Sequence, residues 1–178
     1  IGLPTASALY IAAVLGTELI RLQCYEGLDV HHAVYEWDYA RQLLEVRLLE
    51  AVHAVDRDRA RQELFSEAFL IRRPLLRALQ GAPGRPPVLL IDEIDRADEE
   101  FEAFLLEFLS DFSISIPERG TIRAEEHPVV VLTSNRTREL HEALRRRCVY
   151  HWISYPDPAL EAQIVMMRAS QVARDTAH

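Results

Sequence analysis

The sequence has little cysteine and no long apolar run. It contains two cysteines, Cys24 and Cys148, in 178 residues, too few for the disulfide framework that small secreted domains use. The longest uninterrupted apolar run spans residues 8–15, far short of the roughly 20 residues needed to cross a bilayer. No basic segment followed by an apolar core stands at the N-terminus, which argues against a secretory signal. These absences predict a cytoplasmic protein that does not enter a membrane.

Positive charge is also scarce. Asp and Glu number 28 against 20 for Lys and Arg, and the formal net charge is −8. A protein that coats nucleic acid phosphates is usually basic, so nucleic acid is not the expected partner, although a local basic patch remains compatible with this balance. The chain is 49% hydrophobic and 27% charged, which is typical of one globular domain and excludes a disordered chain.

Short apolar runs alternate with helical patterns. Residues 87–91 and 128–132 each begin with proline, continue as an apolar run and are followed by polar residues, as buried parallel strands do. Residues 18–24 and 148–153 are weaker strand candidates. Helices are expected over residues 98–108 and near 140–147, and a further helix is expected to begin near residue 160. Strands alternating with helices predict an α/β fold, a three-layer αβα sandwich around a mostly parallel sheet.

One segment departs from this alternation. Residues 113–117 alternate polar and apolar side chains, residues 118–120 contain a glycine, and residues 121–123 return to a strand-like pattern. This pattern predicts a β-hairpin between a helix and a strand.

The strongest chemical signal is a pair of carboxylates, Asp92 and Glu93, directly after the predicted strand at residues 87–91. Open α/β sheets bind ligands at the carboxyl ends of their strands. A Mg²⁺ ion that carries a nucleotide needs a carboxylate nearby, and attack on a terminal phosphate needs another group to orient or deprotonate water. Asp92 suits the first role and Glu93 the second. The alternative is that acidic residues simply end a strand.

A second signal follows the predicted strand at residues 128–132. Asn135 would lie at the same edge of the sheet as Glu93, where its amide could reach a terminal phosphate or the attacking water. Thr-Ser-Asn after a strand is also ordinary turn and helix-capping chemistry.

Three arginines, at residues 145–147, close a predicted helix. Cations favour the negative end of a helix, and this explains one or two of them. Arg147, or Arg146 if the register differs by one, could instead reach a phosphate bound by an adjacent subunit.

These residues resemble the AAA+ ATPases, and within them the MoxR group. Leu-Ile-Asp-Glu at residues 90–93 resembles the Walker B motif, Asn135 resembles sensor 1, Arg147 resembles the arginine finger, and the hairpin at 113–123 resembles the insertion before sensor 1. The resemblance runs from about residue 18 to residue 153. It is closest to the branch associated with maturation of carbon monoxide dehydrogenase and related molybdenum hydroxylases. That branch shares segments like those at residues 22–27, 35–39 and 91–97.

The resemblance implies an ATPase that uses ATP and Mg²⁺, with Asp92 at the metal and Glu93, Asn135, Arg146 and Arg147 as candidate catalytic residues. It also implies a homo-oligomer, usually a hexamer, that remodels a client metalloenzyme with a partner carrying a von Willebrand A-type domain. Residues 1–154 would form the nucleotide-binding α/β subdomain, and residues 155–178 a linker and the start of a truncated helical lid.

The sequence departs from the family in one respect. It has no Gly-x-x-x-x-Gly-Lys-Ser/Thr motif, and no lysine is placed to hold β- and γ-phosphates. Residues 6–12 resemble the helix before the phosphate-loop strand, and residues 13–17 resemble the end of the helix after it. We therefore expect that the strand and its loop are missing near residue 12. Since the family places that strand centrally in its sheet, the strands beside it would have unpaired backbone groups.

Two other classes of protein remain open. A degenerate AAA+ subunit without a phosphate loop would keep the fold as a partner-binding module. Loaders of DNA clamps or helicases share Asp92, Glu93, Asn135 and Arg147, but the acidic balance disfavours them.

Overall fold

A computed structural model describes residues 3–51 and 63–154, together with residues 157, 159–160, 162–163, 165–167 and 169. The chain forms two compact units, residues 1–147 and 148–178. In the described part of the chain, no helix is long and apolar enough to span a membrane.

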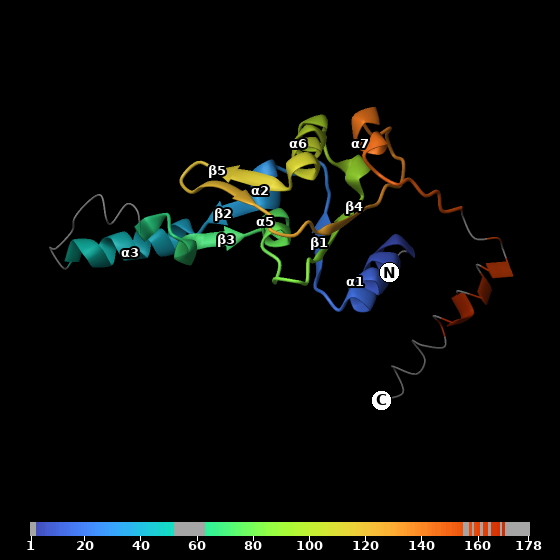
Figure 1. Cartoon of the computed structure of the whole chain (residues 1–178), viewed down its shortest axis with the longest axis horizontal. Coiled ribbons are helices and arrows are strands. Elements are labelled where there is room, and N and C mark those ends of the chain that lie inside the picture. The colour runs from blue at the N-terminus through green and yellow to red at the C-terminus, as the bar shows by residue number, and fades with distance from the viewer. Residues whose placement is uncertain are drawn as a thin grey trace. The chain divides into compact units, whose positions relative to one another are not determined.

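A three-stranded parallel sheet forms the centre of the first unit (Figure 1). Its strands are β1 (Leu19–Gln23), β4 (Val88–Asp92) and β7 (Val129–Leu132), in the order β1-β4-β7. All five residues of the central strand β4 are buried. The strands predicted at residues 18–24, 87–91 and 128–132 are therefore confirmed.

Helices cover both faces of this sheet. Because side chains alternate along a strand, Val88 and Leu90 of β4 pack with Ala8 and Ala12 of α1 (Leu3–Leu15). Leu89 and Ile91 point to the opposite face, toward the cluster that contains side chains of α5 (Pro74–Leu79) and α6 (Glu99–Asp111). The predicted αβα sandwich is thus confirmed, with β4 at its centre.

Helix α6 begins as the sequence predicted. The Asp98 side chain accepts a hydrogen bond from the Phe101 amide at 2.8 Å, and acidic residues occupy the first turn, where they favour the helix dipole. Phe101, Leu105 and Phe108 share one face of the helix and are fully buried. This face fixes α6 against the sheet.

The N-terminal helix is continuous. Residues expected as parts of two different helices, 6–12 and 13–17, form α1 as far as Leu15, and Gly16 follows in the left-handed conformation with φ of 63°. In the described sheet β7 pairs with β4 alone, and Val129 on β7 is 37% exposed. In the described sheet β1 and β7 are therefore the two edge strands.

An inserted segment lies between β1 and β4 in the chain. It contains α2 (Val30–Val34), β2 (Tyr35–Trp37), α3 (Tyr39–Ala51), the 3-10 helix η1 (Glu67–Phe69) and β3 (Leu70–Arg72). Strands β2 and β3 pair in antiparallel fashion. Trp37 is buried and contacts Tyr35 and Phe65 edge to face, so these aromatic side chains pack within the insertion.

The predicted hairpin is present as β5 (Ser113–Ile116) and β6 (Gly120–Arg123). Gly120 has φ of 80°, a conformation that glycine adopts without strain. Ile114 and Ile116 are buried, and Arg119 at the turn pairs with Glu67 at 3.0 Å. The hairpin is therefore anchored on one face and at its turn.

The prediction of a strand at residues 148–153 is wrong, because residues 149–154 have no regular secondary structure. Its β-branched and aromatic residues favour a strand, but such a strand is stable only beside a hydrogen-bonded neighbour. The described residues between 159 and 169 are helical, as expected for a helix that begins near residue 160.

Candidate active site

Asp92 ends β4 and lies in register with Gln23 at the end of β1. It is 8% exposed. Its Oδ1 atom accepts a hydrogen bond from the Thr133 hydroxyl at 2.5 Å, and its Oδ2 atom pairs with Arg21 at 2.5 Å. Both oxygens of this carboxylate are therefore held at the carboxyl edge of the sheet.

Glu93 turns the chain sharply at this edge. Its φ of 55° lies in the left-handed region, which non-glycine residues adopt only where the surroundings impose it. The Thr133 hydroxyl accepts a hydrogen bond from the Glu93 amide at 2.9 Å. One threonine side chain therefore fixes the backbone of Glu93 and the carboxylate of Asp92.

The Glu93 side chain reaches across the end of the sheet. Its Oε1 atom accepts a hydrogen bond from the Asn135 side-chain amide at 3.2 Å, and its Oε2 atom accepts one from Gln23 at 3.1 Å. Arg96 also pairs with Oε2 at 3.3 Å. The structure thus brings Glu93 and Asn135 together, as their places after neighbouring strands predicted, and the Glu93 side chain stays 31% exposed.

Helix α7 (Glu142–Arg146) carries Arg146 and is followed by Arg147, and the described side-chain contacts of these two arginines are local. Arg146 pairs with Glu142 at 2.5 Å, and Arg147 donates to the Ala143 carbonyl at 3.2 Å. Among the described contacts, neither arginine reaches Asp92 or Glu93 of the same chain.

Three polar residues of the site were missed in the sequence analysis: Arg21, Gln23 and Thr133. Arg21 and Gln23 alternate with buried Leu22 on β1, and this period-2 pattern was the available signal. Thr133 directly follows β7, and its 2.5 Å contact with Asp92 depends on the pairing of β4 with β7.

Cys24 lies beneath this edge of the sheet and is fully buried. Burial, followed by the nearby charges of Asp92, Asp95 and Glu93, raises the pKa of its thiol from 9.0 to about 12. Because the thiolate is the reactive form, Cys24 acts as a small apolar side chain and not as a nucleophile.

Native Cys24 should therefore resist alkylation. At pH 8 a pKa of about 12 leaves a thiolate fraction about 10³-fold below that of a thiol with pKa 9.0. We expect mass spectrometry after a short iodoacetamide treatment to find Cys24 unmodified in the folded chain and modified in denaturant. Labelling at the same rate in both states would contradict this assignment.

The residues fit a nucleotide-bound Mg²⁺ better than a metal held by protein alone. In the described part of the chain, no group of three or more His, Cys, Asp or Glu side chains could hold a metal. Mg²⁺ bound with a nucleotide typically keeps several waters and needs only one or two carboxylates. Asp92, with both oxygens already partnered, suits a water-mediated contact.

Two carboxylates and an amide thus lie at the carboxyl edge of a parallel sheet with helices on both faces, the place where open α/β sheets bind ligands. Residues 5–153 match the family described as "ATPase family associated with various cellular activities (AAA)". This match covers most of the sequence, and the chain belongs to that family. No curated protein matches this sequence.

One similar solved structure is that of a protein from Cytophaga hutchinsonii ATCC 33406, described as a "putative ATPase". The two chains are 16% identical, and their TM-score is 0.57. The match covers 96% of this chain and 44% of the other. At this identity the similarity concerns the fold, and the chain spans less than half the length of that structure.

Proposed function

We propose that this chain is a subunit of an AAA+ ATPase of the MoxR type, which hydrolyses ATP with Mg²⁺ to remodel or mature a client enzyme. The observation that supports hydrolysis best is the Asn135 amide at 3.2 Å from the Glu93 carboxylate, beside Asp92 at the end of β4. Family membership supports nucleotide binding independently.

In this proposal each side chain has a separate role. The partly exposed Glu93 carboxylate accepts a proton from the attacking water, while Asn135 orients the water or a terminal phosphate. Asp92 would hold the Mg²⁺ ion through water, and the metal would neutralise the charge that develops on the phosphates. Gln23 holds the second oxygen of Glu93 and so fixes the direction of the base.

The phosphate loop is the part that this sequence does not supply. All 20 cationic residues in the Lys and Arg count are arginines, and the chain contains no lysine. We infer that a strand carrying such a loop would pair with an edge strand of the sheet, β1 or β7, because each of these has a described neighbour on one side only. The alternative function is a binding module that keeps the fold without hydrolysing ATP, and the lack of a phosphate-loop motif in this sequence favours it.

Asp92→Asn should weaken the Mg²⁺-dependent part of nucleotide binding, because the charge nearest the metal is lost. We expect a titration of labelled ATP to show at least a tenfold smaller gain in affinity on addition of Mg²⁺ than in the parent chain. Arg21→Gln is the matched control. It removes the same ion pair but keeps the carboxylate, so its Mg²⁺ response should equal or exceed that of the parent.

This titration also separates the two functions. The ATPase is supported if Mg²⁺ raises the affinity for ATP in the parent chain and no longer raises it in Asp92→Asn. A folded parent chain that binds no ATP at any Mg²⁺ concentration favours the binding module.

Assembly and partners are part of the same proposal. The chain is proposed to act in the cytoplasm as a homo-oligomer, with a hexamer as the expected form. The expected partners are a protein with a von Willebrand A-type domain and a client metalloenzyme, with a molybdenum hydroxylase as the first candidate. The hairpin β5–β6 is the element proposed to act on the client, because its turn is exposed. Movement of the hairpin would have to break the ion pair between Arg119 and Glu67. AAA family membership supports the oligomer.

A further inference from the structure

Residues 135–141 connect the two halves of the proposed machinery. This segment, here called the strap, begins at Asn135 beside Glu93 and ends at His141, the N-cap of α7. Helix α7 carries Arg146 and continues into Arg147. The position of the strap therefore determines where the Asn135 side-chain amide lies relative to Glu93 and where helix α7 begins.

The first end of the strap is tied to Asp95, in the 3-10 helix η2 (Ile94–Arg96). Asp95 is 3% exposed. Its Oδ1 atom accepts a hydrogen bond from the backbone amide of Asn135 at 3.1 Å. Its Oδ2 atom accepts hydrogen bonds from the backbone amide and the hydroxyl of Thr137, at 2.8 and 2.6 Å. Between them Arg136 has φ of 57°, so this carboxylate holds a turn that a non-glycine residue does not favour.

Charge also stabilises this tie. Burial alone would raise the pKa of Asp95, but the hydrogen bonds from Thr137 and Asn135 outweigh burial and lower it below its usual value. Because the pKa of Asp95 is lower in the folded chain than in the unfolded chain, ionised Asp95 stabilises the fold at pH values above its unfolded pKa of about 4. This stabilisation is lost as the pH falls through the pKa of the folded chain. Asp95 is thus ionised and holds the strap at neutral pH.

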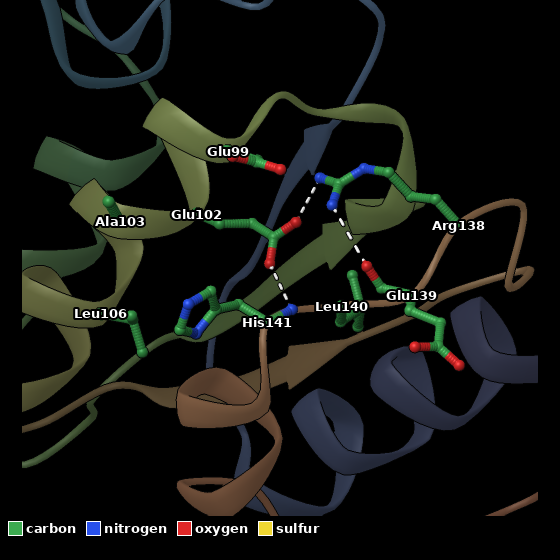
Figure 2. Close-up of a pocket in the computed structure, with 8 residues that line it drawn as sticks. All are labelled: Glu99, Glu102, Ala103, Leu106, Arg138, Glu139, Leu140 and His141. Carbon is green, nitrogen blue, oxygen red and sulfur yellow. Dashed lines mark hydrogen bonds and ion pairs between the residues drawn. The ribbon is translucent and has the colours of Figure 1, made fainter.

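The second end of the strap is tied to Glu102 on α6, which is 2% exposed. Figure 2 shows its carboxylate between the Arg138 guanidinium and the backbone of His141. Glu102 pairs with Arg138 and accepts from the His141 amide at 2.9 Å. Arg138 also donates to the Ala97 carbonyl, so the strap is joined to α6 and to the loop before it.

We propose that Asp95 and Glu102 are positioning residues, which clamp the strap so that Asn135 stays against Glu93 and α7 starts at a fixed place. Neither carboxylate touches the reacting groups. Their effect on hydrolysis rests on the proposed function, whereas their effect on the Glu93–Asn135 contact does not. A strap held in this way connects Asn135 at the proposed site to Arg146 and Arg147, which are proposed to act on an adjacent subunit.

The contact itself is the first readout. NMR of the intact chain reports the Asn135 side-chain amide, and Glu93→Gln changes the charge at its partner oxygen. We expect this substitution to shift the Asn135 side-chain resonances in the parent, and to shift them at least twofold less in Asp95→Asn or Thr137→Val backgrounds. Asp95→Asn places a donor NH2 group opposite the backbone and side-chain donors of the strap. Thr137→Val removes the hydrogen bonds of the Thr137 hydroxyl with Asp95 while keeping the side-chain shape.

Matched controls come from outside the clamp. Thr121→Val removes the 3.0 Å hydrogen bond with Ser115 in the hairpin and should keep the full shift. For the second tie, Glu102→Gln should speed hydrogen exchange of the His141 amide at least tenfold. Glu142→Gln, which breaks the exposed pair with Arg146, should not.

Four outcomes decide the proposal. Loss of the shift in Thr137→Val, with faster His141 exchange in Glu102→Gln, supports it. An unchanged shift in Thr137→Val overturns the clamp even if Asp95→Asn fails to fold. If the chain hydrolyses ATP, Thr137→Val should lower kcat at least fivefold with KM within twofold, and an unchanged kcat overturns the link to catalysis. A parent chain without hydrolysis contradicts the proposed function alone, and the NMR result still decides the clamp.

Discussion

Glu93→Gln is expected to slow ATP hydrolysis by roughly 10²-fold or more while ATP stays bound, because an amide cannot accept the proton of the attacking water. The substitution disturbs the site little. A glutamine at this position keeps an oxygen for the Asn135 amide, and the Gln23 amide, which now donates to Oε2, can rotate to accept from it. The loss should therefore appear in kcat and not in the affinity for ATP.

The control is Glu100→Gln, a change of the same kind at an exposed position in the first turn of α6. It should leave turnover within twofold of the parent. Phosphate release and equilibrium binding of labelled ATP are measured on both variants. Equal turnover in Glu93→Gln and parent would remove Glu93 from the mechanism.

Arg147→Ala should lower hydrolysis by roughly 10³ to 10⁵-fold, the range that an arginine finger contributes. Arg147 contacts only a carbonyl of its own helix among the described interactions, whereas Arg146 already pairs with a carboxylate. This difference makes Arg147 the first candidate and Arg146 the second. The variant should still assemble and bind ATP, because Arg147 makes no described contact with Asp92 or Glu93.

Sedimentation and ATP titration test assembly and binding of Arg147→Ala, and phosphate release tests turnover. Glu142→Ala is a suitable control, since it changes the same helix but leaves both arginines in place. A loss of assembly equal to the loss of turnover would indicate a structural arginine.

The central sheet could be predicted from the sequence because a short apolar run between a proline and polar residues, such as residues 87–91, is typical of a strand buried on both faces. Helix α6 could be predicted from Asp98 and the spacing of Phe101, Leu105 and Phe108. These signals are local in the chain. Asp92, Glu93 and Asn135 could be assigned to one edge of the sheet because the carboxyl ends of parallel strands lie together.

The contacts that shape the site depend on distant partners, and so they were missed. Thr133 fixes Asp92 and Glu93 across the pairing of β4 with β7, some 40 residues along the chain. The left-handed backbone of Glu93 follows from that contact and not from its residue type. Residues 148–153 failed as a strand for the same reason, since composition favours a strand but only a paired neighbour stabilises one.

The most direct test of an ATPase site shared between chains is a mixture of two impaired variants. Arg147→Ala and Glu93→Gln chains are each expected to be nearly inactive alone. A mixed oligomer contains some interfaces with an intact Glu93 on one chain and an intact Arg147 on the next. The account predicts that turnover recovers on mixing, to well above the sum of the two variants and with a maximum near equal proportions. No recovery, in mixtures shown to co-assemble, would contradict a shared site and favour the binding module.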